Sequence, residues 1–158
     1  MLHIRRYQPA DHEAVWDLHH TALHAVNAHA GSGPWDDDLH QIEAVYLNNG
    51  GEFLVGIYDT EIVAIGGLKR TSADRAEIKR MRVKPAFWRR GFGQAMLTAL
   101  ERRAVELGYT GLHLDTTVQQ EAAQRLYIKN GFREVRRAKI GHFDIIVYEK
   151  SLVELPQA

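Results

Sequence analysis

The sequence predicts an α/β (α+β) fold in which helices pack on a mixed sheet, and two patterns predict it. Short alternating runs, bounded by glycine, proline or asparagine, indicate strands. Longer segments with apolar residues at steps of three or four indicate helices. Together they give the order β, α, α, β, β, β, α, β, α, β, β, without internal repeats or low-complexity linkers.

The amino-terminal part of the chain is expected to hold one strand and two helices. Residues 2–7 are the strand, and Pro9 opens a helix that we expect to end near Ala30. After a loop at residues 31–34, a second helix spans residues 35–47. The aspartates at its start suit the positive end of a helix dipole.

The rest of the chain is expected to form six strands and two helices. The predicted strands are residues 52–58, 61–69, 76–84, 111–117, 132–140 and 143–150, and the predicted helices are residues 92–107 and 119–129. Asp59 and Thr60 join the first two of these strands with the spacing of a tight hairpin, although the expected glycine is missing.

Composition limits the classes of protein to consider. The chain of 158 residues is long enough for one domain, so we treat residues 1–158 as a single domain. Basic and acidic residues number 20 each, which does not favour nucleic acid as a partner. There is no cysteine, hence no disulfide, thiol nucleophile or thiolate metal site. No apolar run approaches the roughly 20 residues that span a bilayer, so we expect a cytoplasmic protein without a membrane partner.

The most informative segment is Arg89-Arg90-Gly91-Phe92-Gly93-Gln94, which lies between a predicted strand and a predicted helix. Pro85 ends the strand, because proline cannot continue a hydrogen-bonded ladder. The first amides of a helix have no internal partner and lie at the positive end of its dipole, so they bind phosphate oxygens. The two glycines lack a Cβ and allow a bulky polyphosphate to come close.

A pair of glycines is common in ordinary turns and is weak evidence alone. Neither a P-loop ending nor a full G-x-G-x-x-G is present, which disfavours a nucleoside triphosphatase and a dinucleotide-binding dehydrogenase. Basic residues surround the segment, and no acidic residue occurs in residues 78–100. Because side chains alternate along a strand, we expect phosphate contacts from Arg89 and Arg90, with Lys84 as a further candidate. The alternative is a solvated strand edge with ordinary salt bridges.

Nearly the whole chain resembles the N-acetyltransferases of the GNAT superfamily, the acetyl-CoA-dependent enzymes related to histone acetyltransferases. The most specific matches are residues 77–93, 112–116 and 123–132. The resemblance implies a mixed, mostly antiparallel sheet of about seven strands with about four helices. Two positions depart from the family pattern. Trp88 stands where the first glycine motif has Gln or Arg, and Gln120 stands where a later helix often carries Asn.

The same resemblance implies a site for acetyl-CoA, which acts as co-substrate, with no metal. Main-chain groups of Met81, Arg82 and Val83 would bind the pantetheine arm. The phosphates would lie on the segment Trp88, Arg89, Arg90, Gly91, Phe92, Gly93 and Gln94.

Two residues are candidates for the chemistry. Tyr127 would protonate the departing thiolate, and Glu77 would take the proton of the acceptor amine. Alternatives remain open for both: Tyr127 as a core aromatic, and Glu77 as a surface partner of Lys79. A water chain, His113 or Asp115 could replace Glu77 as the base.

The predicted function is transfer of an acetyl group from acetyl-CoA to a primary amine by direct attack in a ternary complex. The absence of cysteine excludes a cysteinyl acyl-enzyme. A non-catalytic acyl-CoA sensor is the alternative. The acceptor stays open between a small molecule and a peptide or protein amine, and a homodimer is compatible with the sequence. By analogy, His29, Trp35 and the turn at residues 142–143 flank the acceptor groove.

Overall fold

The computed structural model describes residues 1–26 and 34–152. The strands are β1 His3–Arg6, β2 Glu52–Tyr58, β3 Glu61–Arg70, β4 Arg75–Val83, β5 Gly111–Thr117, β6 Arg133–Ile140 and β7 Phe143–Ser151. The α-helices are α1 His12–Ala25, α2 Phe92–Glu106 and α3 Glu121–Lys129. Short helical segments are η1 Pro9–Asp11, η2 Pro34–His40, η3 Glu43–Leu47 and η4 Pro85–Phe87. Among these described residues, no helix is both long and apolar enough to cross a membrane.

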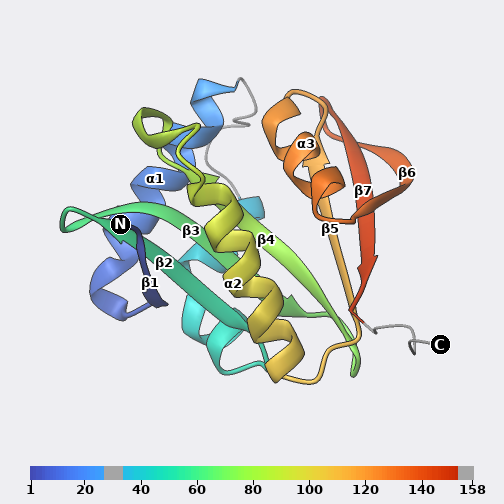
Figure 1. Cartoon of the computed structure of the whole chain (residues 1–158), viewed down its shortest axis with the longest axis horizontal. Helices are drawn as coiled ribbons and strands as arrows, with labels where there is room; N and C mark the ends of the chain where they lie inside the picture. Colours follow the sequence, from blue (N-terminus) through green and yellow to red (C-terminus); the bar gives the residue numbers. More distant parts are fainter. Residues whose placement is uncertain (27–33, 153–158) are drawn as a thin grey trace.

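All seven strands form one sheet with the order β1-β2-β3-β4-β5-β7-β6. Every neighbouring pair is antiparallel except β4 and β5, which run parallel. Helix α2 lies in front of the sheet in Figure 1 and α1 lies behind it. The predicted mixed, mostly antiparallel sheet is therefore confirmed.

The parallel strands β4 and β5 pair over only three positions, ending at Glu77 opposite His113. Beyond that pair β4 continues beside β3 to Val83, and β5 continues beside β7 to Thr117. The two strands diverge as they run on (Figure 1). We call this divergence the splay, and it leaves one edge of each strand without a strand partner.

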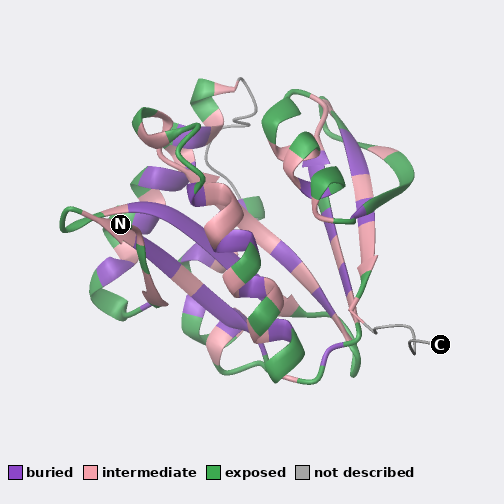
Figure 2. Cartoon of the chain, in the orientation of Figure 1, coloured by how far each residue is buried: buried purple, intermediate pink, exposed green. Residues whose placement is uncertain are grey.

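Two hydrophobic cores cover opposite faces of the sheet. The first contains residues of α2 and α3 against the central strands, among them Met96, Leu100, Leu112 and Tyr127. The second contains residues of α1, η2 and η3, including Val15, Leu39 and Tyr46. Figure 2 shows buried positions alternating in the first part of β4 and along β5, whereas β3 is buried continuously over its middle. This alternation decides which side chains of β4 face each core.

A bulge in β4 shifts that alternation. Arg80 adopts a left-handed backbone conformation, with φ 60°, and the register with β3 slips between Ile65 and Gly67. As a result Met81 and Val83 pack on the α2 side. Arg82 pairs with Ile65, a residue of the α1-side core, and so directs its side chain to that face.

Most predicted boundaries hold within a few residues, and the predicted hairpin is present. Asp59 and Thr60 both have positive φ, 47° and 67°, as a tight hairpin turn requires even without glycine. The first helix ends at Ala25, earlier than expected; the predicted boundary at Ala30 and most of the predicted 31–34 loop lie outside the described residues.

The expected single helix over residues 35–47 is wrong. A 3₁₀ segment, η2, is followed by a π segment, η3. The buried positions explain the difference, because Asp36, Leu39 and Ile42 recur at the three-residue spacing of a 3₁₀ turn.

Candidate active site

The segment between β4 and α2 exposes a row of free main-chain amides. Arg89 and Gly91 have φ values of 64° and 81°, and Gly91 caps the helix. The first helical hydrogen bond runs from the Ala95 N–H to the Gly91 carbonyl, at 3.0 Å. Within the part of the chain that the structure describes, no amide of residues 89–94 donates a hydrogen bond. Such a concave run of amides at a helix N-terminus is suited to phosphate oxygens.

Gly93 lies where this segment approaches the end of β4. A Cβ built on Gly93 would be 3.5 Å from Leu126 Cδ2 and 3.8 Å from Val83 Cγ2, which is ordinary contact. A side chain at this position therefore points toward α3 and the end of β4. A methyl group fits at this position. A longer or charged side chain would enter the region beside the free amides of residues 89–94.

Trp88, the residue that departs from the family pattern, fastens the segment to β4. Its indole N–H donates a hydrogen bond of 2.8 Å to the carbonyl of Val83. The ring itself stays 42% exposed. Trp88 thus fixes the turn through a side-chain contact within the protein.

The basic side chains near the segment are mostly engaged elsewhere. Arg90 donates to the Tyr58 hydroxyl at 2.9 Å, and its guanidinium lies 4.6 Å from the centre of the Tyr58 ring. Lys84 forms an ion pair with Glu61. Arg89 has no hydrogen bond or ion pair among residues 1–26 and 34–152. Of the three predicted cations, Arg89 is thus the one whose side chain is not committed within the protein.

Two amide side chains join the helices around the splay. Gln94 and Asn130 exchange hydrogen bonds of 2.9 and 2.8 Å, which ties α2 to α3. Gln120 accepts hydrogen bonds from Thr116 and Thr117 at the end of β5. The departure at Gln120 therefore serves to connect β5 to the start of α3.

At the end of β4, the main-chain N–H and C=O groups of successive residues point alternately toward β3 and toward the splay. The Lys84 N–H donates to the Val63 carbonyl of the β3 side at 2.8 Å, so the main chain of Arg82, two residues earlier, also faces β3. Met81 and Val83 then face the splay. Their carbonyls accept hydrogen bonds from the Arg82 guanidinium and the Trp88 indole. The main chain of Arg82 does not lie where the sequence analysis placed it.

Tyr127 lies on α3 with its ring in the core beside Phe132 and Tyr148. The residue is 5% exposed. Burial raises the pKa of Tyr127 to about 12; Asp115 acts in the same direction, and the positive charge of Arg82 opposes it. The phenol is therefore protonated at neutral pH. Its ring is a core aromatic, and its role as an acid stays a prediction.

Glu77 occupies the last paired position of β4, opposite His113 at the base of the splay. In the described chain it forms no ion pair with Lys79, so the surface-pair alternative is not supported. The charges that act on Tyr127 are those of Arg82 and Asp115. Asp115 lies on β5 two residues beyond the last pair, on the same face as His113. Asp115 is thus a second candidate base.

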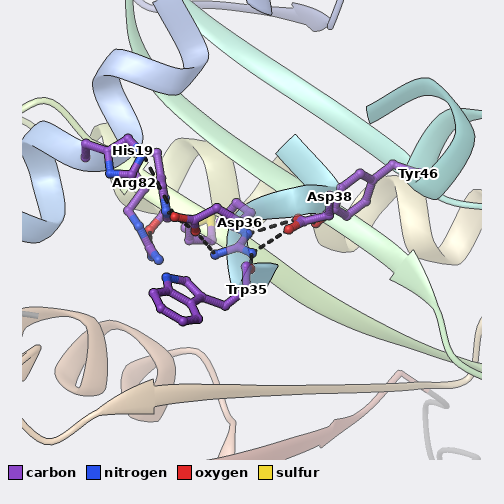
Figure 3. A network of polar contacts seen from close by, with 9 residues as sticks. His19, Trp35, Asp36, Asp38, Tyr46 and Arg82 are labelled. Atoms are coloured by element: carbon purple, nitrogen blue, oxygen red, sulfur yellow. Dashed lines mark hydrogen bonds and ion pairs between the residues drawn. The ribbon is translucent and has the colours of Figure 1, made fainter. Parts of the chain in front are cut away.

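A buried polar network covers the α1 face next to the splay (Figure 3). Arg80 donates to both oxygens of Asp38, at 3.0 and 2.5 Å, and lies 3.6 Å from Asp36. Asp36 is 3.0 Å from the Nε2 of His19, and Asp38 accepts a hydrogen bond from Tyr46. Burial, together with the charges of Arg82 and Arg80, lowers the pKa of His19 to about 2. The network therefore contains a neutral histidine and one arginine held by two carboxylates.

His19, His20 and Asp36 bring potential metal ligands within 4.8 Å of one another. Asp36 comes from η2 and the two histidines come from α1, so no local sequence pattern predicts this group. The Nη1 of Arg80 lies 3.6 Å from the same carboxylate. A guanidinium already occupies the position that a cation would need, so this donor set favours an ion pair over a metal ion.

Of the residues expected to flank an acceptor groove, Trp35 is the second residue of η2 and is 54% exposed. Its carbonyl accepts a hydrogen bond of 2.6 Å from Arg80. The turn at residues 142–143 joins β6 to β7, and His29 lies outside the described residues. Arg82 was predicted to contribute its main chain only, and the direction of its side chain to the α1 face was not predicted.

A sheet that opens between two parallel strands, beside a helix with free amino-terminal amides, is the arrangement expected of the acetyltransferase fold predicted from the sequence. The sequence itself matches the acetyltransferase (GNAT) family over residues 12–132, and the chain belongs to that family. It is thus an enzyme of the acetyltransferase class.

Known proteins support the assignment. The chain is 28% identical over 129 residues to the uncharacterized N-acetyltransferase YjgM of Escherichia coli K12, covering 78% of this chain and 77% of that protein. A GNAT-family acetyltransferase from Staphylococcus aureus Mu50 superposes with a TM-score of 0.89 at 25% identity, over 97% of this chain and all of that one. An acetyltransferase from Salmonella typhimurium, solved with its cofactor acetyl-CoA, has a TM-score of 0.79 at 22% identity, over 99% and 96% of the two chains.

Proposed function

We propose that the chain transfers an acetyl group from acetyl-CoA to a primary amine by direct attack within a ternary complex. The observation that carries the proposal is the presence of three features around the splay. They are the free amides of residues 89–94, the open edge at Met81 and Val83, and the buried phenol of Tyr127, which interacts electrostatically with Arg82. These features suit the three parts of acetyl-CoA, namely its pyrophosphate, its extended amide arm and its thioester.

Each part of the cofactor then has its own group of residues. The amides of residues 89–94 hold the pyrophosphate, and Arg89 adds a charge from its side chain. Met81 and Val83 direct the pantetheine arm along β4. Trp88, through its hydrogen bond to Val83, keeps the two binding regions in a fixed relation.

Tyr127 assists departure of the thiolate. A thiol has a pKa of about 8.5, so complete transfer of a proton from a phenol with a pKa of about 12 is uphill. Tyr127 therefore donates a hydrogen bond to the developing thiolate while the charge of Arg82 offsets the negative charge on its oxygen. The proton released by the attacking amine balances the one taken up by sulfur.

An amine with a pKa near 10 is mostly protonated at neutral pH and needs a base. Glu77 is our first candidate, because its carboxylate at the base of the splay has no ion-pair partner in the described chain. Asp115 is the alternative, supported by its electrostatic effect on Tyr127. Glu77→Gln and Asp115→Asn, compared over a pH series, would separate the two, because removal of the base abolishes the acidic limb of the rate profile.

The test of the function combines two measurements on the whole chain. Calorimetry measures the affinity for acetyl-CoA, and a thiol-release assay measures free CoA in the presence of a broad amine panel. We expect binding and amine-dependent CoA release. Binding without release for any amine would support the non-catalytic sensor, and the absence of binding would disprove the cradle.

A further inference from the structure

Arg82 is a partly buried cation on the α1 face of the sheet, and it forms no ion pair with a carboxylate of the described residues. Its Nη1 donates to the Met81 carbonyl at 2.8 Å, and its buried Nε–H has no partner in the described chain. No ion pair of residues 1–26 and 34–152 includes it. Burial and the neighbouring charge of Arg80 lower the pKa of Arg82 to about 10. The fold therefore places the positive charge of Arg82 in surroundings that destabilise it.

The neighbouring arginine shows what a structural role requires. Arg80, two residues earlier, is held by Asp38 and Asp36 and also donates to the Trp35 carbonyl. Both carboxylates are committed to that arginine, to His19 and to Tyr46. Of these two carboxylates, only Asp36 acts on the charge of Arg82, and it does so without forming an ion pair with it. Figure 3 shows Arg82 beside His19 at the edge of this network.

No carboxylate of the described residues forms an ion pair with Arg82, and Asp36 and Asp115 act on its charge only from further away. Residues 27–33 contain neither aspartate nor glutamate. β7 ends beside Gly111, at the end of β5 away from the splay. In the proposed complex the pantetheine arm and the thioester are uncharged, and the phosphates lie on residues 89–94. A buried charge left without a partner is strongly unfavourable, so the missing anion is expected to come from the acceptor.

We propose that Arg82 binds a carboxylate of the acceptor, and that the acceptor is a small α-amino-acid-like molecule whose amine and carboxylate are separated by one carbon. This inference rests on the proposed function. Arg82 and Tyr127 each act on the charge of the other, so the anion lies close to the reacting centre. The carboxylate must therefore be close to the attacking nitrogen. Polyamines lack such a group, and a protein amino terminus has an amide in its place.

The test compares matched acceptors in matched variants. Proteinogenic amino acids and their α-amides are assayed by thiol release with the wild type, Arg82→Gln and Lys79→Gln. Lys79 lies on the same strand, and its substitution removes one positive charge without removing Arg82. A carboxylate on arginine makes charge-assisted hydrogen bonds, so we expect the wild type to prefer amino acids over amides by about 10-fold to 100-fold in kcat/KM.

In Arg82→Gln this preference should fall to about two-fold or less, mainly through a higher KM for amino acids, and Lys79→Gln should retain it. Arg82→Lys should keep part of it. Two outcomes would overturn the inference. One is equal loss of kcat on amino acids and amides in Arg82→Gln, which would indicate that Arg82 stabilises the reacting oxygen. The other is a wild type that does not distinguish the two acceptor series.

A second readout keeps the inference separate from the proposed function. Calorimetry with amino acids on the CoA-bound chain measures acceptor binding without turnover. Binding by the wild type and loss of binding in Arg82→Gln would support the carboxylate site even if no amine releases CoA. Equal binding in both variants, or none by the wild type, would refute the site while leaving acetyl transfer to be judged by thiol release.

Discussion

The two sides of the splay are built in different ways. The proposed cofactor side consists of main-chain groups: the amides of residues 89–94 and the open edge of β4. The proposed acceptor side consists of side chains from α1, η2 and β4, namely His19, Asp36 and Arg80, with Arg82 beside them. The first is set by a local sequence motif, and the second by tertiary contacts. A cofactor shared by a whole family fits the first construction, and an acceptor particular to one enzyme fits the second.

The largest expected effect tests where the two sides meet. Tyr127→Phe removes the hydroxyl and leaves the ring beside Phe132 and Tyr148. We expect kcat to fall by about 100-fold to 10,000-fold, because an acidic group positioned to assist departure of the thiolate contributes on that scale. The calorimetric affinity for acetyl-CoA should remain unchanged. A normal single-turnover rate, measured where chemistry is limiting, would remove Tyr127 from the mechanism.

The next effect concerns the cradle alone. Gly93→Asp places a carboxylate beside the open amides, and we expect the affinity for CoA to fall by about 10-fold to 100-fold through repulsion of the phosphates. Gly93→Ala is the matched control, because its Cβ would make only ordinary contacts with Leu126 and Val83. Thermal unfolding of both variants should resemble that of the wild type. If Gly93→Ala and Gly93→Asp bind CoA with equal affinity, the phosphates do not lie beside residues 89–94.

The contrast also explains what the sequence could predict. The strand-loop-helix order around Gly91 and Gly93 is encoded locally by alternation, Pro85 and helical spacing, so this part of the fold was predicted correctly. The helix expected over residues 35–47 was wrong because burial of Asp36, Leu39 and Ile42 at three-residue spacing overrides the helical prediction. The His19–Asp36 contact joins segments 17 positions apart and carries no local pattern.

Arg82 illustrates the same limit. The sequence assigned it a main-chain role, since the family resemblance covers that strand. The bulge at Arg80 and the alternation of hydrogen bonds turn its main chain to β3 and its side chain to the α1 face. A one-residue bulge reverses every later side chain of a strand, and it leaves no sign in the hydrophobic pattern before it.

A third prediction concerns the pH dependence of the acceptor side. The pKa of His19 is about 2 in the folded chain against 6.5 in the unfolded one. Between these values the unfolded chain binds a proton that the folded chain does not, so stability falls as pH decreases below 6.5. The slope approaches about 1.4 kcal/mol per pH unit.

Chemical denaturation at several pH values measures this slope. His19→Gln retains a hydrogen-bond donor for Asp36 and should reduce the dependence of stability on pH. This expectation holds whatever the stability of the variant near neutral pH. His3→Gln, at an exposed position of β1, is the control and should leave the wild-type slope intact. An unchanged slope in His19→Gln would mean that His19 does not control the acid stability.

The smallest expected effect tests the connection between cradle and strand. Trp88→Phe keeps an aromatic ring and removes the N–H that donates to the Val83 carbonyl. A hydrogen bond of this kind contributes about 1 kcal/mol, so we expect affinity for acetyl-CoA to weaken about three-fold to ten-fold. Trp16→Phe, on α1, is the matched control and should bind normally. If Trp88→Phe binds like the wild type, the amides hold their arrangement without the indole, and the cofactor side depends on main chain alone.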